Sequence, residues 1–381
     1  MKIAIVRQRY NPYGGAERFV ERALSALSSE GAEVSLITRS WAGAPAEGFR
    51  QITCDPAYSR LWGGRAARDR SFAVAAADLM TQGGYDITQS HERIPGCMIF
   101  RAGDGVHAAW LAHRARTLGP LGRLGQRCSG YHRYVLAAEE RMFAHPALRA
   151  VICNSQMVAD EIHRFYGVDR QKLILIYNGV DHAHFHPGLA VQYRDVTRRA
   201  AGIPSDVPLL LYVGSGFERK GVPRLLPAMA RVSHSFHLVI VGQDRKQRAM
   251  QALAARLGLS DRVHFTGPLK DVRPWYGAAD AFVLPTLYDP GPNAALEAMA
   301  CGLPILTTTT CGAQDWVVEG KNGYVVTPLD IDALADGLRK LCDLAQRGDA
   351  HVAALGAVEQ LGLSAMAERL IALYRGVHAL G

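Results

Sequence analysis

The chain has 381 residues, a length that suggests two or three domains. Hydrophobic residues make up 49% and charged residues 20%, which is ordinary for a packed globular protein and excludes a disordered chain. The net charge of +8 is concentrated in one part: residues 1–180 hold 23 basic and 16 acidic side chains, whereas residues 181–381 hold 20 and 19. This excess predicts an anionic partner for the first part, such as nucleic acid, an acidic substrate or a membrane surface.

The apolar runs and the cysteines indicate the compartment. The apolar run before Arg7 has only four residues, too few for the apolar region of a signal peptide. No stretch approaches the ~18 apolar residues of a membrane-spanning helix. The seven cysteines are odd in number, widely spaced and without a C-x-x-C pair, which argues against a disulfide framework and a zinc site. We therefore expect free structural thiols in a cytoplasmic protein.

Short apolar runs alternate along the chain with helical patterns, which is typical of βαβ units with a parallel sheet. Strands are expected at residues 2–6, 33–38, 150–153, 172–177, 208–214, 237–242, 263–267, 281–285 and 304–308. Helices are expected after Gly14-Gly15, between 153 and 172, near 222–230, near 248–257, between 267 and 281, and from Asn293. The pattern predicts an α/β fold with two consecutive doubly wound units.

The segment NGVDHAHFHPG (178–188) separates these two units, because turn formers and polar residues dominate it. We expect residues 1–180 to form the first domain and residues 201–362 the second, with a linker region at 181–200. Residues 363–381 are expected to form a C-terminal helix that packs back on the first domain.

Gly14 and Gly15 lie where the first strand passes into the first helix. A glycine pair in this position lets backbone N–H groups approach an anion at the positive end of the helix. The alternative is an ordinary tight turn, so this pair is weak evidence when it is taken alone.

A second glycine-rich turn lies in YVGSGFERKGV (212–222). A dinucleotide fingerprint needs glycine where Arg219 stands, and a phosphate loop needs lysine where Val222 stands, so both motifs fail. Arg219 and Lys220 beside this turn suit a diphosphate that is bound without a metal. The alternative is ordinary surface charge.

The block VLPTLYDPGPNAALEAMACGLPILTT (283–308) carries two acids separated by seven residues. Asp289 precedes the expected helix, and Glu297 lies about one turn inside it, where a carboxylate can accept both hydroxyls of a ribose. The N–H groups of Asn293 and Ala294 begin this helix and point toward a bound phosphate. The alternative is a helix-start acid at Asp289 and a solvated Glu297.

This block resembles the E-x7-E signature of the retaining glycosyltransferases of family 4, which have the GT-B fold. The resemblance covers most of the chain in order: GGAERF, ICNS, NGVD, RKGV, VHFTG, ADAFVLPT, LEAMACGLP and GKNGYVV. Within the family, the glycine pair, SWAGAP (40–45) and RKG (219–221) are most similar to the enzymes that glucosylate the heptose of the lipopolysaccharide core.

The resemblance implies a role for each matched position. Glu297 would hold the ribose hydroxyls of a nucleotide-diphosphate sugar, and Asp289 the hydroxyls of its sugar. Arg219 and Lys220 would neutralise the diphosphate, and the loop of Gly14 and Gly15 would close on it. Backbone groups near Leu269 would contact the base.

Two positions depart from the family pattern. Asp289 is one methylene shorter than the first glutamate of the signature. The donor-site pair Gly214-Ser215 replaces the common glycine–arginine, so that Arg219 would supply the missing cation.

The segment GDGVH (103–107) places Asp104 and His107 in a glycine-rich loop of the first half. In the family this region lines the cleft beneath the donor sugar, so either residue is a candidate contact of the acceptor or the transferred sugar. His91 is a further candidate and is equally consistent with a structural role.

A D-x-D motif at Asp330 and Asp332 would suit a metal-dependent transferase of another fold. Because it opens the helical pattern of residues 333–341, we interpret Asp330 as an N-cap and expect no metal site and no cofactor.

Residues 105–138 contain no acid but five arginines with apolar residues between them: Arg114, Arg116, Arg123, Arg127 and Arg133. This pattern predicts a basic amphipathic surface on anionic lipid, whereas the alternative is a solvated arginine-rich helix.

The sequence therefore favours a metal-independent, retaining hexosyltransferase that uses a nucleotide sugar, with UDP-glucose as the best guess. Its acceptor would be a cell-envelope glycan or glycolipid such as lipopolysaccharide core, and it would lie at the inner face of the cytoplasmic membrane. The rival hypotheses are an oxidoreductase, a catalytically silent GT-B scaffold and a protein that binds anionic surfaces. A nucleic-acid partner is not expected, because the aromatic platform motif of RNA-binding proteins is missing.

Overall fold

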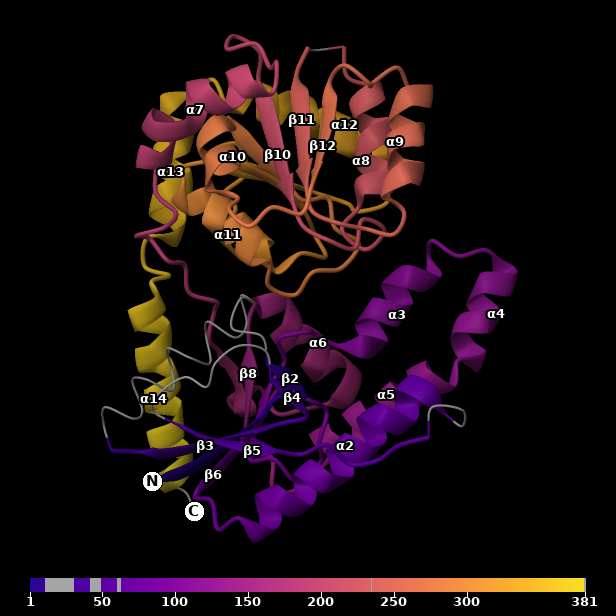
Figure 1. Ribbon diagram of the computed structural model, residues 1–381, viewed down its shortest axis with the longest axis vertical. Helices are drawn as coiled ribbons and strands as arrows, with labels where there is room; N and C mark the ends of the chain where they lie inside the picture. Colours follow the sequence, from indigo (N-terminus) through magenta and orange to yellow (C-terminus); the bar gives the residue numbers. More distant parts are fainter. Residues whose placement is uncertain (11–30, 42–48, 60–62, 234, 380–381) are drawn as a thin grey trace. The chain divides into compact units, whose positions relative to one another are not determined.

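A computed structural model describes residues 1–10, 31–41, 49–59, 63–233 and 235–379. It divides into two compact units, residues 1–179 with 363–381 and residues 180–362 (Figure 1). The helix expected after Gly14-Gly15 lies outside the described residues. Each unit has one large parallel sheet with helices beside it, as the alternating apolar pattern predicts.

The sheet of the first unit has the strand order β5-β3-β1-β6-β7-β8-β9, and every neighbouring pair is parallel. The interior strand β1 buries Ile3 to Val6 on both faces, which is typical of a parallel sheet between helices. The strands of this unit are β1 (Lys2–Val6), β2 (Arg9–Tyr10), β3 (Glu33–Thr38), β4 (Ser40–Trp41), β5 (Arg50–Thr53), β6 (Ile87–Ser90), β7 (Ile99–Arg101), β8 (Ala150–Cys153) and β9 (Leu173–Leu175).

The helices of the first unit include one that lacks any buried residue. This helix, α4, is held between α3 and α5 by a few contacts only. The described helices of the unit are α2 (Gly64–Gln82), α3 (His107–Ala115), α4 (Pro120–Cys128), α5 (Gly130–Phe143), α6 (Gln156–Tyr166), the short η1 (Arg170–Lys172) and α14 (Leu363–Ala379).

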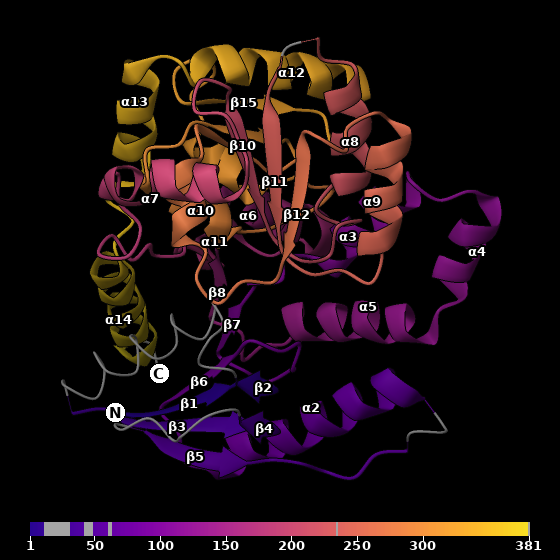
Figure 2. The same cartoon turned by 45° about the horizontal axis from the view of Figure 1, so that its top comes forward.

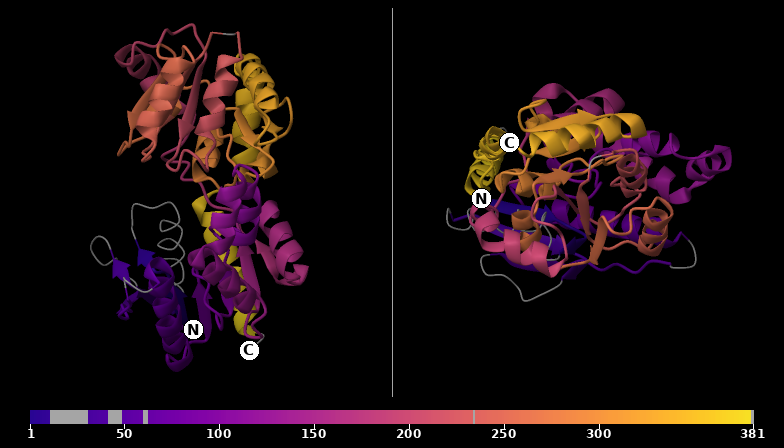
Figure 3. Two further views of the ribbon diagram at one scale, coloured as in Figure 1. Left: turned by 90° about the vertical axis from the view of Figure 1, so that its right-hand side faces the viewer. Right: turned by 90° about the horizontal axis from the view of Figure 1, so that it is seen from above.

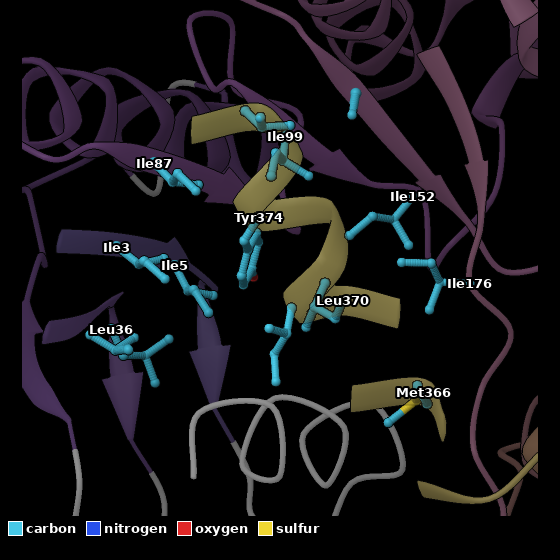
Figure 4. Packing of buried hydrophobic residues seen from close by; sticks show 14 residues of the cluster. Ile3, Ile5, Leu36, Ile87, Ile99, Ile152, Ile176, Met366, Leu370 and Tyr374 are labelled. Carbon is cyan, nitrogen blue, oxygen red and sulfur yellow. The ribbon is translucent and has the colours of Figure 1, made fainter. Parts of the chain in front are cut away.

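Helix α14 completes the core of the first unit although it ends the chain. Its Met366, Leu370 and Tyr374 pack with Ile3 of β1 and Ile152 of β8, and all five residues are buried (Figure 4). Figure 3 shows the yellow ribbon of α14 against the strands of this unit. The first unit is therefore built from two segments that are about 180 residues apart in sequence.

The second unit has the strand order β12-β11-β10-β13-β14-β15, also fully parallel. Figure 2 shows α8 and α9 at one side of its first three strands and α7, α10 and α11 at the other. The strands are β10 (Leu209–Val213), β11 (His237–Val241), β12 (Val263–Gly267), β13 (Ala281–Val283), β14 (Ile305–Thr308) and β15 (Gly323–Val326). The helices are α7 (Gly188–Ala200), α8 (Val222–Ala230), α9 (Gln247–Arg256), α10 (Arg273–Ala278), α11 (Asn293–Ala300), the short η2 (Gly312–Trp316), α12 (Ile331–Leu344) and α13 (Gly348–Val358).

The expected linker region at 181–200 is wrong for most of its length. Residues 188–200 form α7, which packs on α10 within the second unit. Arg198 of α7 is buried, donates from Nε to the Ala278 carbonyl at 2.8 Å and pairs with Asp280 at 2.5 Å. A buried arginine on a polar, arginine-rich helix gives no apolar signal, so the sequence pattern did not reveal this packing.

The state of the cysteines and the apolar character of the helices are both described by the structure. All seven cysteines are free, and only Cys128 among them is exposed. Within the described ranges, no helix combines the length and the apolar character that are needed to cross a bilayer.

Candidate functional site

The strand order of the second unit places a candidate site between β10 and β13. From β10 the chain adds β11 and β12 on one side of β10, and it then returns to add β13 on the other side. The direction in which strands are added therefore reverses between β10 and β13. In open parallel sheets, ligands bind outside the carboxyl ends of the strands at such a switch point. Residues 214–221 follow β10 and residues 284–297 follow β13, so both sequence motifs meet here.

The loop after β10 is shaped by glycine and is tied to the segment after β13. Gly221 has a φ of +88° and caps α8, and a Cβ there would lie 1.8 Å from the Pro285 carbonyl oxygen. The Arg219 carbonyl accepts from Leu287 N at 2.7 Å and from the Thr286 hydroxyl at 3.0 Å. This close approach of two backbones requires glycine, and it fixes the backbone positions from which the Arg219 and Lys220 side chains extend.

Two cations and one carboxylate converge in this site. Lys220 Nζ lies 3.1 Å and Arg219 Nη1 3.7 Å from Asp289 Oδ2. Arg219 Nη1 also donates to the Tyr288 carbonyl at 2.7 Å. The Lys220 stem lies against Gly214, where a Cβ would be 2.7 Å from the lysine Cδ. The structure therefore brings Asp289 together with Arg219 and Lys220, which the sequence singled out in a different motif.

Asp289 is held by its backbone and is not a helix-start acid. Its N–H donates to the Thr310 carbonyl at 3.0 Å, and its carbonyl accepts from Gly312 N at 2.8 Å. The N-cap of α11 is Pro292, three residues later. Within the described part of the chain, Asp289 Oδ2 accepts no well-oriented hydrogen bond although it is buried. This buried oxygen is thus held by the charges of Lys220 and Arg219.

Glu297 lies in the second turn of α11 and is half-buried. Its Oε2 accepts the Tyr276 hydroxyl at 3.0 Å, and this hydroxyl also contacts the Ala294 carbonyl at 3.1 Å. Burial, followed by the charge of Glu297, holds the pKa of Tyr276 well above its usual range. Tyr276 therefore stays a neutral donor that fixes the direction of the glutamate, so Glu297 is a positioned acceptor and not a merely solvated one.

The amino end of α11 begins with Asn293 and Ala294, and no side chain caps it within the described chain. The N–H groups of a first helical turn need partners outside the helix, and an anion satisfies them well.

Ser215 and Leu269 lie in the loops that follow β10 and β12, two strands that are separated by β11 in the sheet. The Ser215 hydroxyl accepts from Gln243 N at 3.3 Å and so ties the loop after β10 to the loop after β11. Leu269 follows β12 and is 39% exposed. Among the described residues, neither side chain contacts Lys220 or Asp289.

Tyr212 is a residue of this site that the sequence analysis missed. Its side chain is fully buried on β10, and its hydroxyl has no hydrogen-bond partner among the described residues. Burial, with the nearby charge of Asp289, raises the pKa of Tyr212 above its usual range. The sequence showed Tyr212 only as one more apolar position in a strand, because burial of a hydroxyl without a partner is a tertiary property.

In the first unit, the carboxyl ends of β6 and β7 carry a second polar cluster around Glu139. This buried carboxylate accepts Arg93 Nε at 2.8 Å, His107 N at 2.9 Å and the Tyr166 hydroxyl at 2.6 Å. His107 is the first residue of α3, so its expected place in a loop is wrong. Burial and then the charge of Arg93 lower the pKa of His107 to about 3, so its ring is neutral at physiological pH. Glu139 itself gave no motif in the sequence.

Asp104 is exposed at the rim of a small cavity of about 120 Å³ beside this cluster. Side chains from α2 and α5 complete the lining, and Tyr131 lies 4.2 Å beneath the guanidinium of Arg65. Glu92 also lines this cavity, and its burial raises its pKa. The cavity offers both charges and an aromatic ring, which is suitable for a hydroxyl-rich ligand.

His91 is buried and lies in a chain of hydrogen bonds that reaches α14. The Tyr374 hydroxyl donates to Gln89 Oε1 at 2.8 Å, and Gln89 Nε2 lies 3.0 Å from His91 Nε2. Burial and then the charge of Arg101 hold the pKa of His91 well below its usual range. This network anchors His91 to the core, in keeping with the structural role that the sequence left open.

The arginine-rich segment forms α3, α4 and the start of α5. Arg116, Arg127 and Arg133 are exposed, as are Leu121 and Leu124 of α4.

Two further arginines of the segment have internal partners. Arg123 Nε donates to the Ala115 and Leu118 carbonyls at 3.0 Å, and Arg114 Nη1 lies 3.4 Å from His132 Nε2. Arg123 is nevertheless exposed, so of the five arginines only Arg114 is partly buried.

The D-x-D motif is a helix start, as the sequence predicts. Asp330 is the N-cap of α12 and accepts Ala333 N at 2.9 Å, and Asp332 pairs with Arg231. Among the described residues, no group of three or more His, Cys, Asp or Glu side chains is arranged to hold a metal ion. Gly14 and Gly15 lie outside the described residues.

Comparison with known proteins places this geometry in context. Residues 13–184 match the family model Glycosyltransferase Family 4, and residues 194–351 match the model Glycosyl transferases group 1. The lipopolysaccharide glucosyltransferase WaaG of Escherichia coli (strain K12) is 29% identical over 346 residues, 89% of each chain. D-inositol 3-phosphate glycosyltransferase 2 of Catenulispora acidiphila is 27% identical over 382 residues, which cover 90% of this chain and 87% of the relative.

The crystal structure of WaaG is also similar in fold. It superposes with a TM-score of 0.80 at 26% identity and covers 98% of this chain and all of the WaaG chain. With two parallel-sheet, Rossmann-like units in each protein, this similarity confirms the predicted GT-B fold.

Proposed function

Since the chain belongs to the glycosyltransferases that join a family 4 domain to a group 1 domain, we propose that it is a retaining hexosyltransferase. Its donor is a nucleotide-diphosphate sugar, for which UDP-glucose is the first choice. Its acceptor is a cell-envelope glycan or glycolipid such as lipopolysaccharide core. The similarity to the lipopolysaccharide glucosyltransferase WaaG supports both choices.

The convergence of Lys220, Arg219 and Asp289 at the switch point of the second sheet carries this proposal. Two adjacent cations match the charge of a diphosphate, and Glu297 lies on the next helix as a positioned acceptor for ribose hydroxyls. With cations supplied by the protein, the diphosphate needs no metal for charge balance, so we propose a metal-independent reaction without a cofactor.

The proposed reaction breaks the bond between the sugar C1 and the diphosphate oxygen, which keeps the electron pair. The acceptor hydroxyl attacks C1 from the same face, and its proton passes to the departing diphosphate. Lys220, Arg219 and the amino end of α11 stabilise the negative charge that grows on this oxygen. Asp289 accepts a hydroxyl of the sugar and orients the ring, and little general-base machinery is needed.

The acceptor binds to the first unit, at the cavity beside Asp104 and the cluster of Glu139, Arg93 and His107. His107 is neutral there, so its ring can exchange hydrogen bonds with a sugar hydroxyl. The exposed arginines and leucines around α4 attach this unit to anionic lipid at the cytoplasmic face of a membrane. A glycolipid acceptor would then be reached without extraction from the bilayer.

A panel of donors and acceptors tests the proposed function. Release of nucleoside diphosphate is measured with the UDP, GDP and ADP forms of glucose and related hexoses, each with and without a soluble lipopolysaccharide-core fragment. We expect acceptor-dependent release with UDP-glucose and an α-linked product, detected by NMR. Release with another nucleotide corrects the donor, a β-linked product overturns retention, and no release with any donor supports a silent scaffold.

The similarity to a D-inositol 3-phosphate glycosyltransferase favours one other acceptor. A phosphorylated polyol is anionic, and the first unit carries the excess of basic residues. Inositol 3-phosphate is therefore included as an acceptor in the same assay, and faster release with it than with the core fragment would replace the proposed acceptor.

A further inference from the structure

The further inference concerns the charge of Asp289 and rests on the proposed diphosphate site. Lys220 is 13% exposed and Asp289 9% exposed at their side chains, so water screens this pair weakly. The lysine ammonium lies 3.1 Å from the carboxylate, and the guanidinium of Arg219 lies 3.7 Å from the same oxygen. A bound diphosphate must interact with cations that already face an anion of the protein.

Neither partner can move away easily. The Asp289 backbone is fixed on both sides by hydrogen bonds to Thr310 and Gly312. The lysine stem is seated on Gly214, and Gly221 holds the following backbone against Pro285. The Lys220 ammonium and the Asp289 carboxylate can move apart only by rotation of their side chains. A diphosphate oxygen that reaches Lys220 therefore stays close to the Asp289 carboxylate.

We infer that Asp289 is a built-in counter-anion that weakens binding of the nucleoside diphosphate product more than binding of the sugar donor. The donor diphosphate is a diester with two negative charges. After the sugar leaves, the terminal phosphate has a second ionisation with a pKa of about 6, so the free product carries nearly three charges at neutral pH. Repulsion from a fixed carboxylate grows with the ligand charge, and it therefore favours product release.

The geometry of this pair also differs from that of a tight structural salt bridge. Asp289 Oδ2 lies within ion-pair distance of Lys220 but accepts no well-oriented hydrogen bond among the described residues. The pair is thus held by charge and not by a directed hydrogen bond. In the proposed reaction Asp289 also orients the sugar of the donor, and this interaction exists only while the sugar is attached.

Replacement of Asp289 by asparagine tests the inference, because it keeps the shape and removes the charge. Calorimetry without added divalent metal measures binding of UDP, UDP-glucose and inorganic pyrophosphate to the full-length protein. We expect Asp289→Asn to bind UDP and pyrophosphate about tenfold more tightly than the wild type does. Its binding of UDP-glucose should become at most about threefold tighter. Steady-state assays of the same variant should show stronger inhibition by UDP.

Three controls define the comparison. Asp289→Glu keeps the charge and should bind UDP as the wild type does. If Asp289→Asn fails to fold, Asp289→Ser replaces it, because it also removes the charge and should show the same tighter binding. Asp336→Asn makes the same change of net charge at an exposed site, where Asp336 pairs with Lys340, and should leave all three affinities unchanged.

The outcomes distinguish this inference from the proposed function. Equal tightening of UDP and UDP-glucose, or unchanged or weaker binding of UDP and pyrophosphate, overturns the counter-anion role. Tighter pyrophosphate binding by the asparagine variant, with no binding of UDP by either protein, keeps the inference and overturns UDP as the nucleotide. If the asparagine variant binds neither ligand at 10 mM, the diphosphate site itself is wrong.

Discussion

At the scale of single residues, Lys220 is the cation whose contribution changes most during the proposed reaction. In the resting protein its charge faces Asp289, so its net attraction for the donor is partly cancelled. The attraction grows as negative charge builds on the departing diphosphate. Lys220→Ala should therefore lower kcat by about 10²–10³-fold and change the donor KM by less than about fivefold.

A matched lysine checks this assignment. Lys246 pairs with Glu218 in the same unit and has no contact with Asp289 among the described residues, so Lys246→Ala removes one charge outside the pair. Its kcat should equal that of the wild type. If Lys220→Ala instead raises KM as much as it lowers kcat, Lys220 binds the ground state and has no special role in bond cleavage.

Glu297 is the residue on which nucleotide affinity should depend. Removal of a charged acceptor from a ribose diol costs about 1.5–3 kcal/mol, so Glu297→Ala should weaken nucleotide binding about 10–150-fold by calorimetry. The fold should survive, because the Tyr276 hydroxyl keeps the Ala294 carbonyl as a partner. Glu359→Ala on the surface should not change the affinity, and an unchanged affinity of Glu297→Ala would show that the ribose lies elsewhere.

At the scale of elements, the start of α8 depends on the missing side chain of Gly221. An alanine there adopts a φ of +88° and places its Cβ 1.8 Å from a backbone oxygen of the neighbouring segment. Gly216 in the same loop has a φ of +79° but open space around a new Cβ. Gly221→Ala should lose about 3–5 kcal/mol of unfolding free energy, and Gly216→Ala about 1–2 kcal/mol.

Urea unfolding of both glycine variants measures the difference. The two positions share the unfavourable backbone region, so the gap between them reports the contact with Pro285. Equal losses would mean that the loop can shift away from the strand end, and that its close approach to β13 is not required.

The exposed part of α4 and its flanks is the proposed membrane surface. At ~1 kcal/mol per arginine near anionic lipid, joint replacement of Arg116, Arg127 and Arg133 by serine should weaken vesicle binding about 100-fold. Binding should be absent for neutral vesicles and should fall with salt, because the Debye length is about 8 Å at physiological ionic strength. Co-sedimentation with vesicles of defined composition measures both effects.

Three exposed arginines of the second unit serve as the control for this surface. Joint replacement of Arg199, Arg248 and Arg256 by serine changes the net charge equally and should leave vesicle binding intact. If the first triple variant loses turnover of a soluble acceptor fragment, these arginines bind anionic groups of the acceptor. Full vesicle binding by that variant would move the membrane contact to another surface.

At the scale of the whole molecule, the first unit depends on a helix that follows the second unit in the chain. Leu370 of α14 is fully buried against the sheet of the first unit. Leu370→Ala should lower the unfolding free energy of this unit by about 2–5 kcal/mol, through lost burial and the cavity that remains. Denaturant unfolding, with Val352→Ala at an exposed position of α13 as control, measures the loss.

A smaller effect than about 1 kcal/mol would contradict the packing of α14. The Leu370→Ala substitution should leave nucleotide binding unchanged, because Lys220, Asp289 and Glu297 all lie in the second unit. A parallel loss of nucleotide affinity would show that the two units are coupled in stability.

The order of strands and helices could be predicted from the sequence because it follows from local patterns. Buried parallel strands are short apolar runs, and helices repeat every 3.6 residues, so β1, β3 and β8 to β14 lie close to where the pattern places them. The family motifs likewise identified the glycosyltransferase domains, since each motif is a run of neighbouring residues. The role of Asp330 as an N-cap could also be predicted, because it depends only on the three residues that follow it.

Tertiary structure alone decided how distant residues meet. Polar partners contact through space, so the pairing of Lys220 with Asp289, the anchoring of Glu297 by Tyr276 and the buried carboxylate of Glu139 gave no local signal. The same reason explains α7, whose arginine is buried against Asp280 where the sequence suggested a linker. Hydrophobic periodicity is a property of neighbours along the chain, whereas charge pairing and burial depend on the fold that brings distant segments together.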